Sequence, residues 1–248
     1  MDNPFSLNGK TILVTGASSG IGKSIAVECS KMGANLIISA RNKIRLNETF
    51  ELLEGNNHQQ YCADLTNPED LQSLVQFLPK LDGFVSNAGI AKPQILQMSK
   101  VEDINNVFEI NTLVPVYLTR LLVQDKKLNK SASLVYISSI NGNNCSSYGS
   151  SIYAASKSAL TGFIKGVSLE LASRNVRVNS INPGMIETDF FKDSNIGAEE
   201  LEKDKLKYPL KRYGRPEEVA FAAVYLLSDA TLWVTGSSLL IDGGFTLQ

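Results

Sequence analysis

Short apolar segments alternate along this chain with longer segments whose apolar residues recur at helical spacing. Several of the short segments are apolar almost throughout, which is typical of strands that are covered on both faces. The pattern predicts strands at Thr11–Thr15, Asn35–Ala40, Gln59–Cys62, Gly83–Asn87, Ser133–Ser138, Arg177–Asn182 and Ser238–Asp242.

Segments with helical spacing fill the intervals between these strands. Regular alternation of strand and helix indicates a parallel sheet with right-handed crossovers and helices on both faces. We therefore expect one α/β domain over residues 1–248, with a doubly wound, mostly parallel, seven-stranded sheet. Residues 189–207 break the alternation, and the charged part Asp193–Lys207 predicts a mobile flap. The predicted helices are Ile21–Met32, Lys43–Leu53, Pro68–Leu78, Val101–Val123, Ile152–Ser173 and Pro216–Ser228.

Composition narrows the class of protein. The 248 residues are 43% apolar, which suffices for a sizeable core, and the net charge is only −1. Near-neutral charge argues against nucleic acid or an anionic membrane as the main partner. No apolar run reaches membrane-spanning length. The first residues show neither a basic region nor an apolar run, so we predict no signal peptide and a cytoplasmic protein.

Cysteine and histidine usage argues against several kinds of site. Cys29, Cys62 and Cys145 are widely spaced and lack metal-binding spacing, which indicates reduced thiols. His58 is the only histidine, and because it lies in a polar run we interpret it as a solvent-facing loop residue. The chain cannot form a histidine-based triad, and we expect no metal site.

A glycine-rich turn, residues 16–22, follows the first strand and opens the first helix. Its glycines permit a tight turn and let a pyrophosphate approach the backbone, where free N–H groups and the helix dipole hold it. The strand–turn–helix context favours a dinucleotide site over a plain tight turn, which is the alternative. The predicted cofactor contacts in this turn are Gly16, Ser18, Ser19, Gly20, Ile21 and Gly22.

The end of the second strand distinguishes NAD(H) from NADP(H). An acidic residue there would bind the ribose 2′-hydroxyl of NAD(H), but residues 38–42 contain none. Arg41 offers a planar cation that suits a 2′-phosphate. We therefore predict NADP(H) as the cofactor; the alternative is that Arg41 is an ordinary surface arginine.

Tyr153 and Lys157 are four residues apart in a predicted helix, so their side chains lie one turn apart on the same face. A nearby ammonium group lowers the pKa of a phenol from its usual value of about 10. At a separation of about 4 Å the shift would be at most roughly three pKa units. The pair would then transfer a proton near neutral pH. The spacing also occurs on ordinary solvent-facing helices, so other motifs must support this interpretation.

Several further motifs occur in one order over nearly the whole chain. They are Thr15-Gly16-x-x-x-Gly20-x-Gly22, Asp64-Leu65, Asn87-Ala88-Gly89, Asn111, Ile137-Ser138-Ser139, Tyr153-x-x-x-Lys157, Asn182-Pro183-Gly184 and Asp242-Gly243-Gly244. This set resembles the short-chain dehydrogenase/reductase family. Segments Pro183–Asp189 and Arg215–Ala220 are most similar to its 3-oxoacyl-(acyl-carrier-protein) reductase-like members. The resemblance implies a Rossmann fold and an NADP(H)-dependent enzyme that interconverts a ketone and a secondary alcohol.

The resemblance assigns catalytic roles to four residues. Tyr153 would be the acid in reduction and the base in oxidation, and Lys157 would lower its pKa and hold the nicotinamide ribose. Ser139 would bind the substrate carbonyl oxygen, because the family's serine lies three residues before a glycine, here Gly142. Alternation along the strand also sends Ser138 to the opposite face. Asn111 would kink its helix and hold a relay water, unless it is a structural amide.

The remaining matches imply cofactor contacts. Asp64 would bind the adenine amino group with Leu65 beside it, although Asp64 also suits a cap of the turn ahead of Pro68. Ile186 and Thr188 would bind the nicotinamide carboxamide. The implied set outside the glycine-rich turn is Arg41, Asp64, Leu65, Asn87, Ala88, Gly89, Tyr153, Lys157, Pro183, Gly184, Ile186 and Thr188.

The chain departs from the family pattern in three places. Ser86 replaces a second asparagine that many members have before Asn87. The loop Asn141–Ser151 is rich in Asn, Ser and Gly and would present polar groups to the substrate. Arg174 matches a basic position that meets an acyl carrier protein, but Lys130 occupies the other one, and solvated helix ends would explain both. An acyl carrier protein is therefore one candidate partner.

The resemblance also implies a homotetramer, with the long helices paired across a two-fold axis and the C-terminal strand and tail in a second interface. Three functions stay open. The first is reduction of 3-oxoacyl thioesters. The second is the same chemistry on a sugar, polyol, steroid or xenobiotic carbonyl. The third is a dinucleotide-binding sensor without catalysis, which the intact set of Asn111, Ser139, Tyr153 and Lys157 disfavours.

Overall fold

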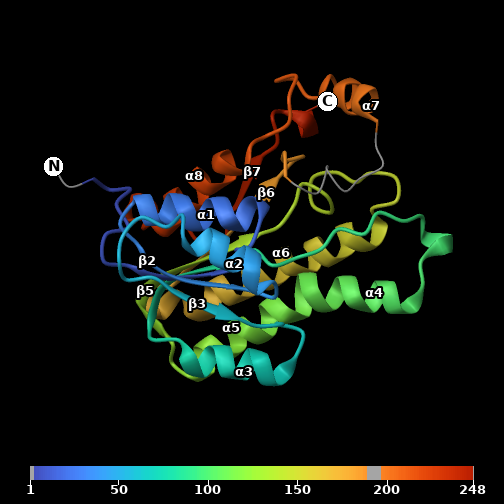
Figure 1. The fold of residues 1–248 in the computed structure, drawn as a ribbon. Helices are drawn as coiled ribbons and strands as arrows, with labels where there is room; N and C mark the ends of the chain where they lie inside the picture. The colour runs from blue at the N-terminus through green and yellow to red at the C-terminus, as the bar shows by residue number, and fades with distance from the viewer. Residues whose placement is uncertain (1–2, 189–196, 248) are drawn as a thin grey trace.

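The structure, a computed structural model, describes residues 3–188 and 197–247. Its centre is a seven-stranded sheet in the order β3-β2-β1-β4-β5-β6-β7, in which every pairing is parallel (Figure 1). This arrangement confirms the predicted doubly wound α/β fold. The order reverses between β1 and β4, which creates a crevice at the carboxyl ends of the strands. The strands are β1 Thr11–Thr15, β2 Asn35–Ala40, β3 Gln59–Cys62, β4 Leu81–Ser86, β5 Leu128–Ile137, β6 Arg177–Pro183 and β7 Ser238–Ile241.

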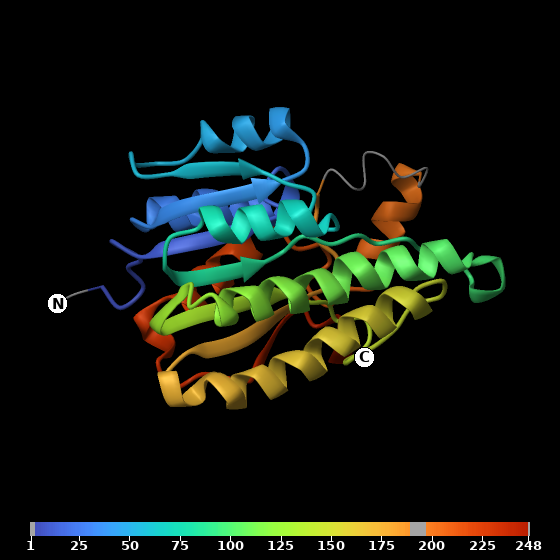
Figure 2. The same ribbon diagram turned by 90° about the horizontal axis from the view of Figure 1, so that it is seen from below.

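Helices cover both faces of the sheet (Figures 1 and 2). On one face α1 packs against α8, with α2 beside it, and on the other face lie α3, α5 and α6. The helices are α1 Gly20–Lys31, α2 Lys43–Phe50, α3 Pro68–Phe77, α4 Val101–Phe108, α5 Val114–Gln124, α6 Ser151–Leu171, α7 Ala198–Lys205 and α8 Pro216–Leu227.

Alternation along the strands produces two hydrophobic cores, one on each face. In β1, Ile12 and Val14 join the core under α1 and α8, whereas Leu13 joins the core under α5 and α6. The same two-residue period sends Val135 and Tyr136 of β5 to opposite faces. Burial on both faces explains why these strands are apolar almost throughout.

The long helix predicted at Val101–Val123 is interrupted where Asn111 lies. A π-helical turn, Glu109–Leu113, separates α4 from α5. Such turns insert one extra residue into the helix and are frequent at functional sites. The interruption allows one polar side chain to leave the packed face of the helix and reach a neighbouring loop.

The predicted start of β5 was wrong by several residues. The strand begins at Leu128, which pairs with Leu81 of β4, and the register shifts between Leu81 and Gly83. The early part of β5 is polar, and Asn129 donates its amide N–H to Asp82 at 2.7 Å. A polar start of this kind carries no apolar pattern, so periodicity alone does not reveal it.

His58 is not simply solvent-facing, which corrects the interpretation from sequence. The ring is half-buried, and its Nδ1 accepts the backbone N–H of Leu36 at 3.1 Å. Its Nε2 lies 2.9 Å from the carbonyl oxygen of Glu54. The imidazole therefore joins its loop to the start of β2.

Only part of the predicted flap can be compared with the structure. Residues 189–196 lie outside the described residues, and most of the remainder forms α7. No helix in the described ranges is long and apolar enough to cross a membrane.

A buried arginine closes the end of α8. The Nη1 of Arg177 donates to the carbonyl oxygen of Leu226 and to Oγ1 of Thr231, both at 2.8 Å, and its Nη2 donates to the carbonyl oxygen of Ser228 at 3.1 Å. The last carbonyls of a helix have no partner within the helix, and leaving them unpaired in the interior is costly. Arg177 therefore joins β6 to the end of α8.

Replacing Arg177 by methionine should lower the free energy of unfolding by about 2–4 kcal/mol, because the buried carbonyl groups of Leu226 and Ser228 lose their charged donor. Only hydroxyl donors, from Ser133 and Thr231, then remain for them. Urea denaturation followed by circular dichroism measures this loss. Arg212→Met, which removes an exposed pair with Glu218, is the matched control and should change stability much less. Equal losses in the two variants would contradict this account of Arg177.

Candidate active site

A cavity of about 910 Å³ opens at the carboxyl ends of the strands. Its lining includes the glycine-rich turn, Arg41, the segment 87–89 and the catalytic candidates Ser139, Tyr153 and Lys157. Among the residues predicted for the site, all of which are described, only Gly22 and Asn111 do not line it. Residues that are far apart in sequence thus converge at the crevice that the topology creates.

The glycines of the turn are required by close packing. Gly16 has φ +64°, and a Cβ there would lie 2.8 Å from the Cα of Ala88. A Cβ on Gly22 would clash with the side-chain amide of Asn87 and with the carbonyl oxygen of Gly16. Gly22 therefore does not face the cavity; it lets α1 approach the end of β4. Close backbone contact is also what a pyrophosphate needs from this turn.

Asn87 and Thr15 hold this contact together. The Nδ2 of Asn87 donates to the carbonyl oxygens of Thr15 at 3.2 Å and Gly16 at 3.0 Å. The Oγ1 of Thr15 accepts the backbone N–H of Asn87 at 3.2 Å and donates to the carbonyl oxygen of Val85 at 3.3 Å. The sequence motif included Thr15, but its role as a clamp between β1 and β4 was not predicted.

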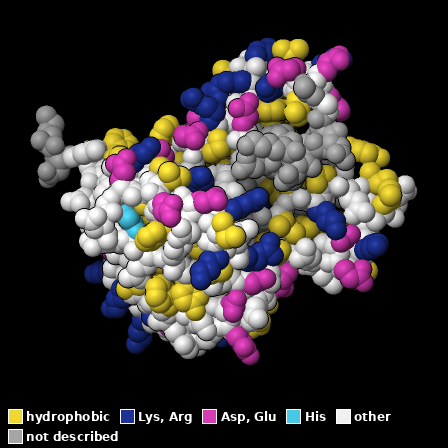
Figure 3. All heavy atoms as spheres, viewed as in Figure 1, with side chains coloured by type: hydrophobic (Ala, Val, Ile, Leu, Met, Phe, Trp, Pro, Cys, Tyr) yellow, Lys and Arg dark blue, Asp and Glu magenta, His cyan; other side chains and the backbone are white. Residues whose placement is uncertain are grey.

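Two arginines line the cavity beside β2. Arg41 follows the strand, and Arg45 lies in the first turn of α2. The side chain of Asn42 caps this helix by accepting the backbone N–H of Arg45 at 3.0 Å. Figure 3 shows Lys and Arg side chains gathered over the region of α2. Arg45 was missed from sequence, although its position four residues after Arg41 on a helix start is a signal for it.

Asp64 faces the same part of the cavity and also caps a turn. Its Oδ1 accepts the backbone N–H of Thr66 at 3.0 Å and the hydroxyl of Thr66 at 2.7 Å. Partial burial acts to raise the pKa of Asp64, but the hydrogen bonds from Thr66 and the charge of Arg41 lower it overall. Asp64 therefore caps this turn, which is the alternative considered from sequence, and it also lines the cavity.

Tyr153 and Lys157 occupy the first turns of α6 and face the cavity together. The Nζ of Lys157 lies 5.9 Å from the ring centre of Tyr153 and donates to the carbonyl oxygen of Ile137 at 2.8 Å. The phenol of Tyr153 is hydrogen-bonded to the side chain of Ser139. Helix α6 and the end of β5 thus bring all three side chains to one place.

The expected lowering of the Tyr153 pKa by Lys157 was wrong. Burial raises the pKa of Tyr153 above its usual value, although the hydrogen bond from Ser139 opposes the shift. Burial also lowers the pKa of Lys157 to about 8. A low-dielectric surrounding disfavours both charged forms, and the amine is directed at Ile137 rather than at the phenol. The expectation from sequence was wrong because it took only the charge of Lys157 into account and not the burial of the two side chains.

Ser138 and Ser139 point in opposite directions at the end of β5. The hydroxyl of Ser138 is buried and donates to the carbonyl oxygen of Lys157 at 3.3 Å. The Oγ of Ser139 accepts the backbone N–H of Asn141 at 3.1 Å and faces Tyr153. Ser138 therefore stabilises the docking of α6, and Ser139 is the serine beside the phenol.

Asn111 braces the site from behind. Its Nδ2 donates to the carbonyl oxygen of Ile90 at 2.9 Å and to Oγ of Ser156 at 3.1 Å, and its Oδ1 accepts the N–H of Ile90 at 2.8 Å. A Cβ on Gly89 would lie 3.1 Å from this Oδ1 and 3.5 Å from Nζ of Lys157. Both amide N–H groups are in use, so a relay water would have to be held by Oδ1 or by a backbone carbonyl.

The opposite side of the cavity contains residues that sequence reasoning did not assign. Tyr208, which follows α7, and Phe245, near the C-terminus, both line it. So do several polar residues of the loop Asn141–Ser151, as expected. Cys145 of this loop is outside the lining, and burial raises the pKa of its thiol, which disfavours a reactive role.

Arg174 and Lys130 are the two basic residues considered for contact with a carrier protein. Both lie at the end of the sheet opposite the cavity of their own chain. Arg174 follows α6 and donates to the carbonyl oxygen of Leu128, the first residue of β5, at 2.7 Å. The 21 residues of α6 span about 30 Å. Tyr153 is near the start of this helix, so Arg174 and Lys130 are distant from the cavity of their own chain.

No cluster of His, Cys, Asp and Glu side chains suited to a metal ion occurs within residues 3–188 and 197–247. The reactive groups that the cavity brings together are the hydroxyls of Ser139 and Tyr153 and the amine of Lys157. Their arrangement suits proton transfer to or from an oxygen atom next to a bound dinucleotide.

Comparison with known proteins places this arrangement in a family. A family model described as enoyl-(acyl carrier protein) reductase matches residues 16–246. The chain is 36% identical to the 3-oxoacyl-(acyl-carrier-protein) reductase FabG of Rickettsia felis, over 97% of this chain and 98% of the relative.

Solved structures agree with the sequence comparison. The Pseudomonas aeruginosa RhlG/NADP active-site complex is 29% identical, with a TM-score of 0.90 over 99% of this chain and 100% of that one. A 7 alpha-hydroxysteroid dehydrogenase complexed with NADH and 7-oxo glycochenodeoxycholic acid is 30% identical, with a TM-score of 0.88 over 98% of both chains. The chain therefore belongs to the short-chain dehydrogenase/reductase family, whose members are oxidoreductases that use nicotinamide dinucleotides and act on CH–OH groups.

Proposed function

We propose that this chain is an NADP(H)-dependent enzyme that reduces 3-oxoacyl thioesters to the corresponding secondary alcohols. The observation that carries this proposal is the convergence of Ser139, Tyr153 and Lys157 on the cavity that the glycine-rich turn also lines. The similarity to a 3-oxoacyl-(acyl-carrier-protein) reductase supports the substrate class.

The residues along the cavity fit a dinucleotide. The glycine-rich turn would hold the pyrophosphate with its backbone N–H groups. Asp64 and Leu65 line the cavity, and Asp64 interacts with the charge of Arg41, where the adenosine would bind. Ile186 and Thr188 also line the cavity. Thr188 also meets the turn itself, because a Cβ on Gly20 would lie 3.2 Å from its methyl carbon. When bound, the nicotinamide supplies or accepts the hydride.

Charge at the end of β2 favours NADP(H). Two guanidinium groups, those of Arg41 and Arg45, line this part of the cavity, and the strand ends without an acidic residue. The carboxylate of Asp64, which also lines the cavity, is held by Thr66 and interacts with the charge of Arg41. A 2′-phosphate would therefore meet two cations there, and charge-assisted bonds of this kind are strong.

The pKa directions support Tyr153 as the proton donor. Because burial raises the pKa of Tyr153, its phenol stays protonated at neutral pH and donates to the carbonyl oxygen during reduction. Ser139 donates a hydrogen bond to the same oxygen and stabilises the charge that develops on it. Lys157, with a pKa of about 8, replaces the proton that Tyr153 has given to the substrate. It also binds the nicotinamide ribose. Asn111 keeps the segment of Gly89 and Ile90 against α6, next to the lysine.

A steroid or another apolar ketone is the second candidate substrate. The similarity to the 7 alpha-hydroxysteroid dehydrogenase favours it, and so does the apolar side of the cavity, where Tyr208 and Phe245 lie. A dinucleotide-binding sensor without catalysis is the third and weakest candidate, because Ser139, Tyr153 and Lys157 share one cavity.

We also propose a cytoplasmic homotetramer. Apolar side chains are exposed on two separate faces, Tyr117 and Leu169 on α5 and α6, and Phe221 and Trp233 around α8. Trp233 is 100% exposed in the single chain. Antiparallel pairing of α6 across a two-fold axis would bring Arg174 of a second copy to the mouth of the cavity. That position would suit an acidic acyl carrier protein as partner.

Tyr153→Phe should reduce kcat/KM for a ketone substrate by about 100- to 10,000-fold, because the proton donor is lost. The Kd for NADPH, measured by fluorescence titration, should change by less than about threefold, since the ring that lines the cavity is kept. Tyr225→Phe, on α8, is the control and should keep full activity. Turnover that survives in Tyr153→Phe would mean that another acid protonates the substrate.

The double variant Arg41→Ala/Arg45→Ala should lower the preference for NADPH over NADH, measured as the ratio of kcat/KM values, by about 10- to 100-fold. Arg120→Ala, an exposed arginine on α5, should leave the ratio unchanged. Wild-type enzyme that used both cofactors equally well would refute the assignment of NADP(H).

Light scattering at micromolar concentration should give about four times the mass of one chain. Trp233→Glu places a charge in one proposed interface and should yield a smaller assembly, because burial of an unpaired charge is unfavourable. Lys203→Glu, a charge reversal on exposed α7, should leave the mass unchanged. A monomeric wild-type protein would exclude the proposed assembly.

A further inference from the structure

Two aromatic side chains from distant parts of the chain meet in the wall of the cavity. Tyr208 follows α7, and Phe245 begins the short helical turn Phe245–Leu247. Their ring centres are 4.8 Å apart with the planes inclined by 32°, and both rings line the cavity that contains Tyr153. We call this pair the aromatic wall.

Tyr208 is held in place from behind. The ring of Tyr213 contacts it edge-on, with centres 5.5 Å apart and planes at 89°. The hydroxyl of Tyr213 in turn donates to Oδ2 of Asp204 at 2.8 Å. Tyr208 itself is only 5% exposed. Its ring therefore cannot turn away from the cavity without disrupting contacts on its other side.

The turn that carries Phe245 is held equally firmly. The carboxylate of Asp242 accepts the backbone N–H of Gly244 at 2.9 Å, and the N–H and hydroxyl of Thr246 at 2.9 and 2.7 Å. Gly244 has φ +83°, and a Cβ there would lie 3.0 Å from Pro209, the residue after Tyr208. The two segments are thus packed directly on each other, and these contacts hold the aromatic wall in position.

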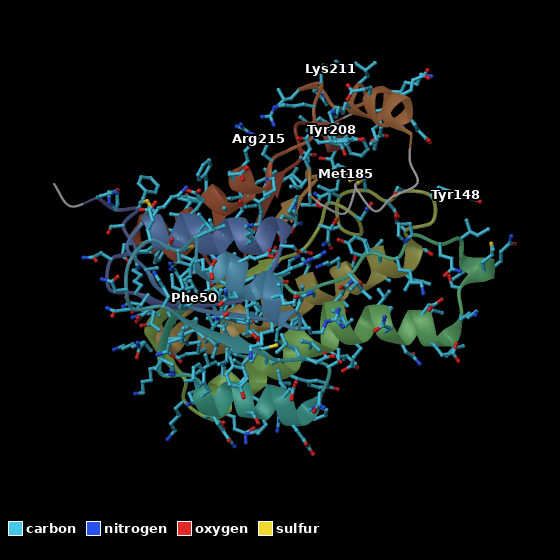
Figure 4. All side chains as sticks on the ribbon, in the orientation of Figure 1. Phe50, Tyr148, Met185, Tyr208, Lys211 and Arg215 are labelled. Atoms are coloured by element: carbon cyan, nitrogen blue, oxygen red, sulfur yellow. The ribbon has the colours of Figure 1, made fainter. Side chains whose placement is uncertain are left out.

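The cavity has different chemistry on its two sides. Figure 4 shows Tyr208 and Met185 close together beneath α7, with Tyr148 apart from them on the loop before α6. The rings of the aromatic wall and the side chain of Met185 are apolar, and the charged neighbours that also line the cavity, Asp204 and Lys207, pair with each other at 2.8 Å. Asn141 and Ser147 on that loop are polar and line the cavity as well. A ligand with one apolar end and one amide-rich end would therefore bind in one orientation.

We propose that the aromatic wall sets the length of the acyl chain that the enzyme accepts. The chain of a 3-oxoacyl thioester points at Tyr208 and Phe245, and the amide-rich thioester arm leaves along the loop Asn141–Ser151. Because the wall is fixed on both sides, extra methylene groups meet a surface that cannot move aside, and overpacking of this kind is unfavourable. This inference rests on the proposed function, because it names the part of the substrate that the wall contacts.

The test compares 3-oxoacyl N-acetylcysteamine thioesters of four, eight and twelve carbons, followed by NADPH absorbance. Each methylene that gains an apolar contact changes kcat/KM by about fourfold. Phe245→Ala removes a ring the size of several methylenes, so the twelve- to four-carbon ratio of kcat/KM should rise at least about tenfold over that of the wild type. Phe245→Leu should give a smaller rise.

Tyr208 offers a matched pair of variants. Tyr208→Ala should shift the ratio in the same direction as Phe245→Ala, whereas Tyr208→Phe keeps the ring and should leave the ratio within about twofold of the wild type. Thermal unfolding and the Kd for NADPH are measured on each variant. If Tyr208→Ala does not fold, the two variants of Phe245 decide the question.

The outcomes separate the inference from the proposed function. Wild-type enzyme that reduces none of the three thioesters overturns the proposed function, and this inference falls with it. Wild-type enzyme that reduces them, together with a folded, NADPH-binding Phe245→Ala variant whose chain-length profile is unchanged, overturns the inference alone. A ratio that rises in Phe245→Ala and stays constant in Tyr208→Phe supports the aromatic wall.

Discussion

The burial of one amine, which has no carboxylate partner among residues 3–188 and 197–247, is the constraint on which the site depends. Lys157 is only 5% exposed, and its Nζ donates to a backbone carbonyl at the end of β5. Desolvation of this kind is unfavourable for the charged form and lowers the pKa of Lys157 to about 8. The same surroundings raise the pKa of Tyr153. The pKa of Lys157 therefore lies closer to neutral pH, at which the amine both binds and releases a proton. Tyr153 stays protonated and remains a donor.

The rest of the fold maintains that burial. Helix α6 must dock closely on the sheet, and the hydroxyls of Ser138 and Thr112 bond to its backbone where Lys157 and Ser156 lie. The π-helical turn at Asn111 then fixes the segment before Ile90 against the same helix. Gly89 is needed there, because a side chain would approach both the Asn111 amide and the lysine. The helix interruption and the glycine thus serve one purpose, which is to keep the lysine enclosed yet close to the cavity.

The sequence allowed the sheet, its helices and most of the site to be predicted, because each of those features has a local signal. Strand ends such as that of β1 run directly into the glycine-rich turn, and Tyr153 and Lys157 share one helix. Features that depend on distant packing were missed or wrong. The polar start of β5 depends on its pairing with β4, the contact of His58 depends on β2, and the pKa of Tyr153 depends on burial. A residue's neighbours in sequence contain none of this information.

The two sides of the cavity differ in the same way, and this explains why reaction type is easier to infer than substrate. The side that would hold the dinucleotide is built from strand ends and the first turns of helices, whose geometry follows from the topology. The other side is built from a polar loop, the residues after α7 and the C-terminal turn, which meet only in the folded chain. Its shape depends on contacts such as that of Tyr208 with Phe245, and small changes there alter the space left for a substrate. Specificity in this fold therefore resides in contacts between segments rather than in motifs along the chain.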